Sequence, residues 1–487
     1  MITLTLLLYN LVGVIVGLIM GALPGLTVTM TAALVVSLTF GWPMVEALVF
    51  IIGAFCGGVL GGALSAIAIN IPGTAAAIAT TFDGFPLKQR GEADTALGLA
   101  LISSLIGGFF GILFFIILGP IIGKYALQFG AQEYFILTVW GLTLVAVLSK
   151  GNFRRGLMSA VIGIFIGMIG MDPVTGLMRF TMGFPLFSGG IHYVVAMIGL
   201  FGMKEVFVQL ASKTGFKLDI KGYKISNLLP NFGLIKKLNL RWAISAPIGA
   251  IVGLLPGTGG DVGALVSYGF LKNVIKKPSR PFGEGAYEGV IGPEVANKAA
   301  VGGALTTMLT LGIPGDSVTA VILGAFYLHG LLPGPTFMLT EKSYFYLIAI
   351  YVTVGMIFAY LMGIIGSNAM IKMLNLPKWY LIALIPVLCI VGSYALQNKL
   401  TDILFMFIFG LLGYILEKSN YPVSPMILGI ILGPMVEVNF RQALIITGSF
   451  SSLLISFFTR PISLILVILV TISFLLQGKI QQLEQST

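Results

Sequence analysis

Charged residues are scarce in this chain of 487 residues: Asp, Glu, Lys and Arg together make up 9% of it. Soluble domains carry roughly 25%, so the sequence excludes a soluble domain of any size. Apolar residues make up 57% and the mean hydropathy is +1.02. Apolar runs of roughly 20 residues, enough to cross a bilayer, recur along the whole length. We therefore expect an all-α polytopic membrane protein in a lipid bilayer, with no cleavable signal.

Residues for metal, redox and catalytic chemistry are equally few. The two cysteines, Cys56 and Cys389, lack metal or redox spacing and are predicted to be packing residues, and the two histidines cannot form a metal site alone. The sequence has no His-Glu-x-x-His, Gly-x-Ser-x-Gly, Walker or aspartate-rich diphosphate motif. We expect no enzyme activity, no direct use of ATP, and no cofactor apart from a coupling ion.

The net charge of +10 does not indicate nucleic-acid binding, because Lys and Arg lie mainly in short connections, where they set membrane orientation. The basic stretch 209–240 is predicted to be a cytoplasmic linker. It separates a first membrane repeat, 1–208, from a second one with C-terminal helices, 241–487. A second basic loop at 272–280 implies that 242–255 and 258–271 form either a re-entrant hairpin or two tilted crossings.

Two motifs recur in the same order. "GLIMGALPGLT" at 17–27 matches "GAIVGLLPGTG" at 249–259, which lies 232 residues later. "GGALSAIAINIPGT" at 61–74 matches "GGALTTMLTLGIPGD" at 302–316, with a single inserted residue. A duplicated membrane fold with helices broken at matching places is typical of secondary transporters. Loop 41–45 lacks Lys and Arg whereas 272–280 has four, which indicates that the two pseudo-symmetric repeats are inverted.

Each repeat contains two Pro-Gly pairs, at 24–27, 72–75, 256–259 and 314–317, and Thr, Ser or Asp follows each of them. Pro-Gly interrupts a helix, and the polar residue can cap a new one. Each break then exposes one carbonyl end and one amide end, which cost several kcal/mol in lipid unless they face protein or a wet cavity. The polar residues either cap their own helices and do nothing more, or the four breaks together surround a binding site.

Helix amide ends suit an anion and free carbonyls suit a cation. Asp316 would repel an anion, so it is predicted to be either a cation ligand or simply an N-cap. The sodium candidates are Asn70, Asp316 and Ser317. The predicted substrate-binding residues share these breaks or their neighbourhood: Gly25, Thr27, Asn70, Gly73, Thr74, Gly257, Thr258, Gly259, Asn297, Gly315 and Ser317.

Three other charged residues are given structural roles. Glu294 and Lys298 are spaced i, i+4 and are expected to neutralise each other on one helix face. Asp83, beside a cytoplasmic loop, is expected to make a turn.

Five motifs resemble the large membrane subunit of tripartite tricarboxylate transporters: "GALPGLTVTMTAAL", "NIPGTAAAIATTFDGFPL", "FGEGAYEGVIGPEVANKAA", "LGIPGDSVTAVILGA" and "HGLLPGP". The resemblance runs from about residue 13 to 440. It implies a permease of the bacterial inner membrane that works with a small membrane subunit of about four helices and a periplasmic solute-binding protein. It also implies citrate-like carboxylate substrates and an ion gradient, typically of sodium. Lys298 departs from the family pattern, which has a second asparagine there.

The sequence is therefore interpreted as a secondary-active, sodium-coupled importer of carboxylates, with a homodimer possible. Its site is expected between the 70–74 and 312–317 tips, flanked by the other two breaks. The alternatives are a self-sufficient ion-coupled organic-anion permease without a binding protein, and an uncoupled channel.

Overall fold

The computed structural model describes residues 2–23, 26–148, 153–172, 175–211, 228, 232–373 and 378–485. The first half begins with four helices that contain the first two breaks: α1 (Leu4–Ala22), α2 (Val28–Leu38), α3 (Met44–Ile69) and α4 (Ile78–Gln89). Then come α5 (Ala93–Ala126), α6 (Ala131–Leu148), α7 (Phe153–Gly167), a two-stranded hairpin of β1 (Gly170–Met171) and β2 (Met178–Arg179), the short 3-10 helix η1 (Pro185–Phe187), α8 (Tyr193–Met197), the π-helical η2 (Ile198–Met203) and α9 (Lys204–Ala211).

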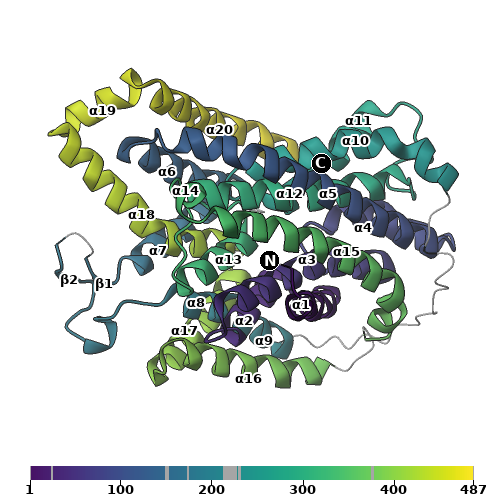
Figure 1. Cartoon of the computed structure of the whole chain (residues 1–487), viewed down its shortest axis with the longest axis horizontal. Helices are drawn as coiled ribbons and strands as arrows, with labels where there is room; N and C mark the ends of the chain where they lie inside the picture. Colours follow the sequence, from purple (N-terminus) through teal and green to yellow (C-terminus); the bar gives the residue numbers. More distant parts are fainter. Residues whose placement is uncertain are drawn as a thin grey trace.

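The second half repeats this order of broken helices (Figure 1). Its elements are α10 (Phe232–Leu254), α11 (Gly259–Val274), α12 (Glu288–Leu311), α13 (Ser317–Leu328), α14 (Phe337–Thr340), α15 (Lys342–Met373), α16 (Lys378–Gln397), α17 (Leu400–Lys418), α18 (Val423–Thr447), α19 (Phe450–Thr459) and α20 (Pro461–Gln485). Most of the predicted linker 209–240 lies outside the described residues, but its last part is already helix, because α10 begins at Phe232.

The polytopic all-α class is confirmed. Within the described residues, seven helices are long and apolar enough to cross a membrane, and an eighth span results if α19 and α20, which meet at 90°, count as one. α18 runs unbroken from Val423 to Thr447, across two shorter apolar stretches at 424–436 and 442–447. The polar residues between them remain helical because they are paired: Arg441 bonds Glu437 one turn earlier at 2.7 Å and Asp172 beside the hairpin at 2.8 Å.

Glycines bring the first helices of each repeat into backbone contact. Gly61 of α3 lies against the carbonyl of Leu18 in α1, and Gly303 of α12 lies against the carbonyl of Ala250 in α10, so neither position has room for a side chain. Gly61 and Gly303 are 242 residues apart, and the same offset separates the prolines of the second and fourth breaks. The comparison of the two sequences suggested one inserted residue in the second repeat, but the helices match without an insertion. Only the string "GGAL" lies one position earlier in α12 than its place in α3 predicts.

The two longest helices show that the repeats are inverted. α5 follows the two breaks of the first repeat and α15 follows the two breaks of the second, and the two helices lie side by side (Figure 1). Gly108 of α5 lies against Met356 of α15, and Gly119 lies against Phe345. The contacts pair increasing residue numbers in α5 with decreasing residue numbers in α15, so these equivalent helices run in opposite directions. A duplicated unit whose equivalent spans are antiparallel is an inverted repeat.

The helices α10 and α11 fold back on each other as a hairpin, a geometry that both predicted forms share. Gly249 and Gly253 lie against the carbonyls of Ala296 and Ala300, so α10 runs parallel to α12. α11 returns, because its Ser267 donates to the carbonyl of Gly292 at 3.0 Å, near the start of α12. Both outer ends of the hairpin therefore lie on the side where α12 begins, which carries the basic loop 272–280.

This topology predicts the orientation of the N-terminal end of α1. Because α10 starts on the side of the basic loops and the repeats are inverted, α1 must start on the opposite, non-cytoplasmic side. Ile2 is 60% exposed, and the native cysteines are buried. Ile2→Cys should therefore react with a membrane-impermeant maleimide in intact spheroplasts. The control Lys276→Cys, in the exposed basic loop, should react only after lysis, and the reverse pattern would refute the topology.

Candidate functional site

The first break ends α1 and starts α2. The Thr27 hydroxyl accepts a hydrogen bond from the amide of Met30 at 3.1 Å, which caps α2. Its predicted neighbour Gly25 lies outside the described residues. The Thr27 side chain therefore caps its own helix, which is one of the two roles predicted for the polar residues after the Pro-Gly pairs.

The second break separates α3 from α4. Asn70 ends α3 in the left-handed conformation (φ 57°) with an exposed side chain, a conformation that asparagine and glycine tolerate best. The chain then turns back along α3, and Gly73 packs against the Ser65 hydroxyl and the backbone of Gly62. The Thr74 hydroxyl accepts from the amide of Ala77 at 3.2 Å. Thr74 therefore stabilises the turn that leads into α4, and α4 itself has no side-chain cap.

The third break is built differently. Gly257 and Gly259 adopt positive φ (80° and 50°) on either side of Thr258. The Thr258 hydroxyl donates back to the carbonyls of Val252 and, at 3.0 Å, Leu255, and its side chain makes no capping bond to α11. Thr258 therefore satisfies carbonyl groups at the end of α10, and α11 begins without a side-chain cap.

The fourth break separates α12 from α13. Gly312 ends α12 with φ 71°, at the position equivalent to Asn70, and Gly315 lies against Ala304. Asp316 forms a capping box: its Oδ1 accepts from the amide of Thr319 at 2.7 Å, and the Thr319 hydroxyl accepts from the amide of Asp316 at 2.9 Å. Asp316 is therefore an N-cap. This does not exclude a second ligand, because a carboxylate can accept several bonds.

The structure brings all four breaks together. The Thr29 hydroxyl in the first turn of α2 lies 2.9 Å from the Ser317 hydroxyl in the first turn of α13, which joins the first break to the fourth. Gly259 lies against the Asp316 side chain, which joins the third to the fourth. Gly73 in the second break lies against the carbonyl of Gly21, which precedes the first break, so this contact joins the second break to the first.

The ring closes between the second and third breaks, where Ala76 packs in one cluster with Ala264 of α11. Asn297 of α12 also belongs to the ring, since its amide oxygen lies against Gly260. The Asn70 side chain is exposed, and no contact in the described residues joins it to Asp316.

Glu294 and Lys298 do not form the expected ion pair among the described residues. Each side chain has a partner on another helix. Glu294 accepts from the hydroxyls of Thr80 (2.5 Å) and Ser104 (3.1 Å), and Lys298 donates to the carbonyl of Cys56 at 2.9 Å. Both charged side chains are buried. They act as links between the repeats, because their partners lie on α3, α4 and α5.

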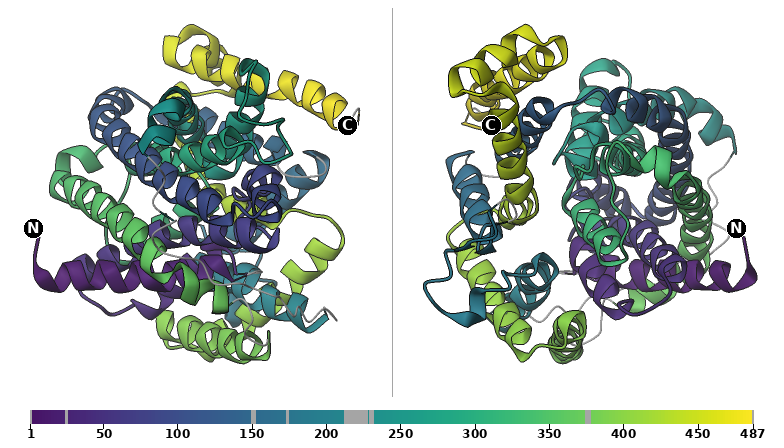
Figure 2. Two further views of the ribbon diagram at one scale, coloured as in Figure 1. Left: turned by 90° about the vertical axis from the view of Figure 1, so that its right-hand side faces the viewer. Right: turned by 60° about the vertical axis from the view of Figure 1, so that its left-hand side comes forward.

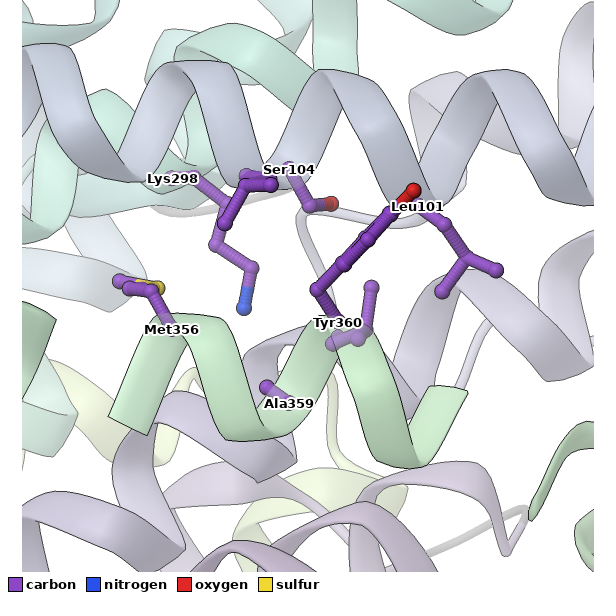
Figure 3. A pocket seen from close by; sticks show the side chains of 8 residues that line it. Leu101, Ser104, Lys298, Met356, Ala359 and Tyr360 are labelled. Carbon is purple, nitrogen blue, oxygen red and sulfur yellow. The ribbon is translucent and has the colours of Figure 1, made fainter. Parts of the chain in front are cut away.

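The Lys298 contact lies where the two repeats meet. Lys298 and Cys56 are separated by the 242-residue offset, so each is the other's equivalent. Beside them is a small pocket of about 170 Å³ of empty space, too narrow for a water molecule. Figure 3 shows the Lys298 amino group directed between α5, which carries Ser104, and α15, which carries Met356 and Tyr360. Apart from Lys298, Ser104 and Tyr360, the residues that line the pocket are apolar.

Sequence reasoning missed Asp83. It does not make a turn; it lies buried inside α4 and accepts from the Tyr268 hydroxyl at 3.0 Å and from three backbone amides of the loop before α12, those of Gly283, Gly285 and Ala286. Nearby, Arg280 donates to Glu92 at 2.5 Å, and this hydrogen bond lowers the pKa of the Glu92 carboxyl. Asp83 thereby ties the second break's helix to the second repeat. Its partners are 185–203 residues away, so no local signal indicated them.

Comparisons with known proteins give one consistent family. The family described as the tripartite tricarboxylate transporter TctA family matches residues 7–428. An uncharacterised 52.8 kDa protein in the TAR-I ttuC′ 3′ region of Agrobacterium vitis is 33% identical over 426 residues, covering 88% of this chain and 84% of that protein. An uncharacterised protein in the TAR-II ttuC′ 3′ region of the same organism is 35% identical over 215 residues, covering 44% of this chain and 87% of that protein. No solved structure matches the chain.

The contact between the first and fourth breaks can be measured by a double-mutant cycle. Thr29→Ala and Ser317→Ala should show a coupling energy of roughly 0.5–1.5 kcal/mol in the free energy of unfolding in detergent, because each removes one partner of the same hydrogen bond. Thr29→Ala combined with Thr353→Ala, whose hydroxyl bonds within its own helix, should be additive. Additivity in the first pair as well would show that the two breaks are not in contact.

Proposed function

Because the chain belongs to the tripartite tricarboxylate transporter TctA family, we propose that it is the permease subunit of a secondary-active importer that takes up carboxylates with sodium as the coupling cation. The observation that carries this proposal is the ring of four Pro-Gly breaks where the two inverted repeats meet. Such half-helix ends near the middle of a membrane supply amide groups for an anion and carbonyl groups for a cation.

The substrate carboxylates would lie among the breaks. Gly73, Gly257 and Gly315 present backbone without side chains, and the Ser317 hydroxyl lies at the junction of two breaks. Thr27 caps α2, and Thr74 accepts a hydrogen bond from the amide of Ala77, the residue before α4. A multiply charged carboxylate would gain most at the starts of α2 and α4, because no acidic residue lies in the first turn of either helix.

Family membership supports two proposed protein partners. We propose that a periplasmic solute-binding protein delivers the substrate to the non-cytoplasmic face and that a small membrane subunit of about four helices packs against the outside of the helices. The inner membrane of a bacterium is the matching location, and a homodimer of the permease is compatible with its broad apolar surface. The N-terminal end of α1 and the C-terminal end lie on opposite sides of the molecule in both views of Figure 2.

Uptake by proteoliposomes tests the proposal. The purified chain, reconstituted with a solute-binding protein and a small membrane subunit of the same transporter family, should accumulate labelled citrate or another member of a carboxylate panel when an inward sodium gradient is imposed. Uptake without the binding protein would favour the self-sufficient permease, and equilibration that ignores every ion gradient would favour the channel. Either result would overturn the proposed mechanism.

A substitution in the ring should stop this uptake. Gly259→Ala places a methyl group against Asp316 and strains a residue with φ 50°, so we expect uptake to fall about tenfold or more, equivalent to roughly 1.4 kcal/mol. The control Gly269→Ala lies in the same helix with no atom near its added methyl group and should stay within about twofold. Equal uptake by both variants would remove the third break from the site.

A further inference from the structure

We propose that Asp316 and Asn297 form the chain's sodium site, at the start of α11, and that the first repeat has no equivalent of it. This inference rests on the proposed sodium-coupled uptake and names the residues that would hold the ion. It differs from the sequence prediction, in which Asn70 was the amide ligand.

Asn297 supplies the first ligand. Its side chain is 4% exposed, and its amide makes no hydrogen bond to any residue that the structure describes. An amide side chain that is nearly buried and has no protein partner keeps its oxygen available to a ligand from outside the chain. The amide oxygen packs against Gly260, in the space that a Cβ atom would occupy if residue 260 were not glycine.

Asp316 supplies the second ligand from the other side. Thr319 occupies Oδ1 through its amide and hydroxyl, both at 2.7 Å. The other oxygen, Oδ2, lies 2.7 Å from the place where a Cβ of Gly259 would be. The Asp316 carboxylate and the Asn297 amide oxygen thus converge on two adjacent glycines, Gly259 and Gly260.

Carbonyl groups beside these glycines suit a cation. α10 ends at Leu254, and the last carbonyls before the break carry partial negative charge. The hydroxyl of Thr258 donates to two of them, and the carbonyl of Gly253 faces Gly315, beside Asp316. Carboxylate, amide and carbonyl oxygens are the ligands that hard cations prefer. A single carboxylate matches the charge of a monovalent ion.

The inverted repeat supplies an internal comparison. With the 242-residue offset, the equivalents of Asp316 and Asn297 are Thr74 and Phe55. Phe55 is a buried aromatic residue in the hydrophobic core, and Thr74 carries no charge. The first repeat therefore lacks both oxygen ligands, and its half of the ring remains free of negative charge for the substrate. One such sodium ion per chain follows.

Direct binding of sodium tests the site without transport. The full-length chain in detergent should bind ²²Na⁺ saturably with a Hill coefficient near one, at constant ionic strength maintained with choline chloride. Asp316→Asn should weaken binding about tenfold or more, because asparagine keeps the helix cap but loses the charge. Asn297→Ala should weaken it roughly threefold to tenfold, because it removes one neutral ligand.

The matched control is Asp261→Asn, which removes the same charge from an exposed position in the first turn of α11. It should change sodium affinity by less than twofold. An equal loss in this variant would assign the effect to the general electric field and overturn the site. Melting temperatures within a few degrees of the parent establish that each variant is folded.

Two failures can be told apart. If the parent chain binds sodium and both Asp316→Asn and Asn297→Ala bind it unchanged, the proposed site is wrong while sodium-coupled uptake can still be measured. If the parent chain binds no sodium and uptake ignores a sodium gradient, the coupling ion of the proposed function is wrong, and the site fails with it.

Discussion

Backbone amide and carbonyl groups that lack partners cost several kcal/mol each in hydrocarbon, and the arrangement of this molecule depends on that cost. Four helices stop at Pro-Gly pairs, so each stop leaves such groups in an apolar environment. The chain satisfies some of them locally, through Thr27, Thr74 and the Asp316–Thr319 capping box. It encloses the remainder by placing the breaks against one another. The groups that stay available are those that a polar ligand can use.

Enclosure requires close approach, and glycine makes close approach possible. The paired helices α1–α3 and α10–α12 touch through backbone atoms at Gly61 and Gly303 and at similar positions along each pair. In membranes, where the hydrophobic effect does not draw helices together, such small-residue contacts provide the packing. The same contacts set the positions of the breaks. Packing and binding geometry are therefore parts of one arrangement.

The backbone is symmetric, but the chemistry is not. Lys298 faces its own equivalent, Cys56, and Asp316 corresponds to Thr74. An inverted repeat lets the two halves exchange conformations during alternating access, and in the proposed site the unequal side chains would let one half hold a cation and the other an anion. The buried pair Glu294 and Lys298 contributes to the contact between the halves through Thr80, Ser104 and the Cys56 carbonyl. Through these hydrogen bonds, a conformational change in one repeat can alter the other.

The sequence by itself determined the membrane class, the duplication and the places where helices break, because composition and residues such as Pro and Gly act on the backbone next to them. It left Asp316 as either an N-cap or a cation ligand. Tertiary structure alone decided which breaks touch, that Thr258 serves the preceding helix, that Asp83 binds a loop about 200 residues later, and that Asn297 faces Asp316's side of the ring. It also decided the register of α3 against α12, since a one-residue shift is invisible in repeated glycines but turns a helix face by 100°. Those outcomes depend on side chains far apart in the chain, and only packing brings them together.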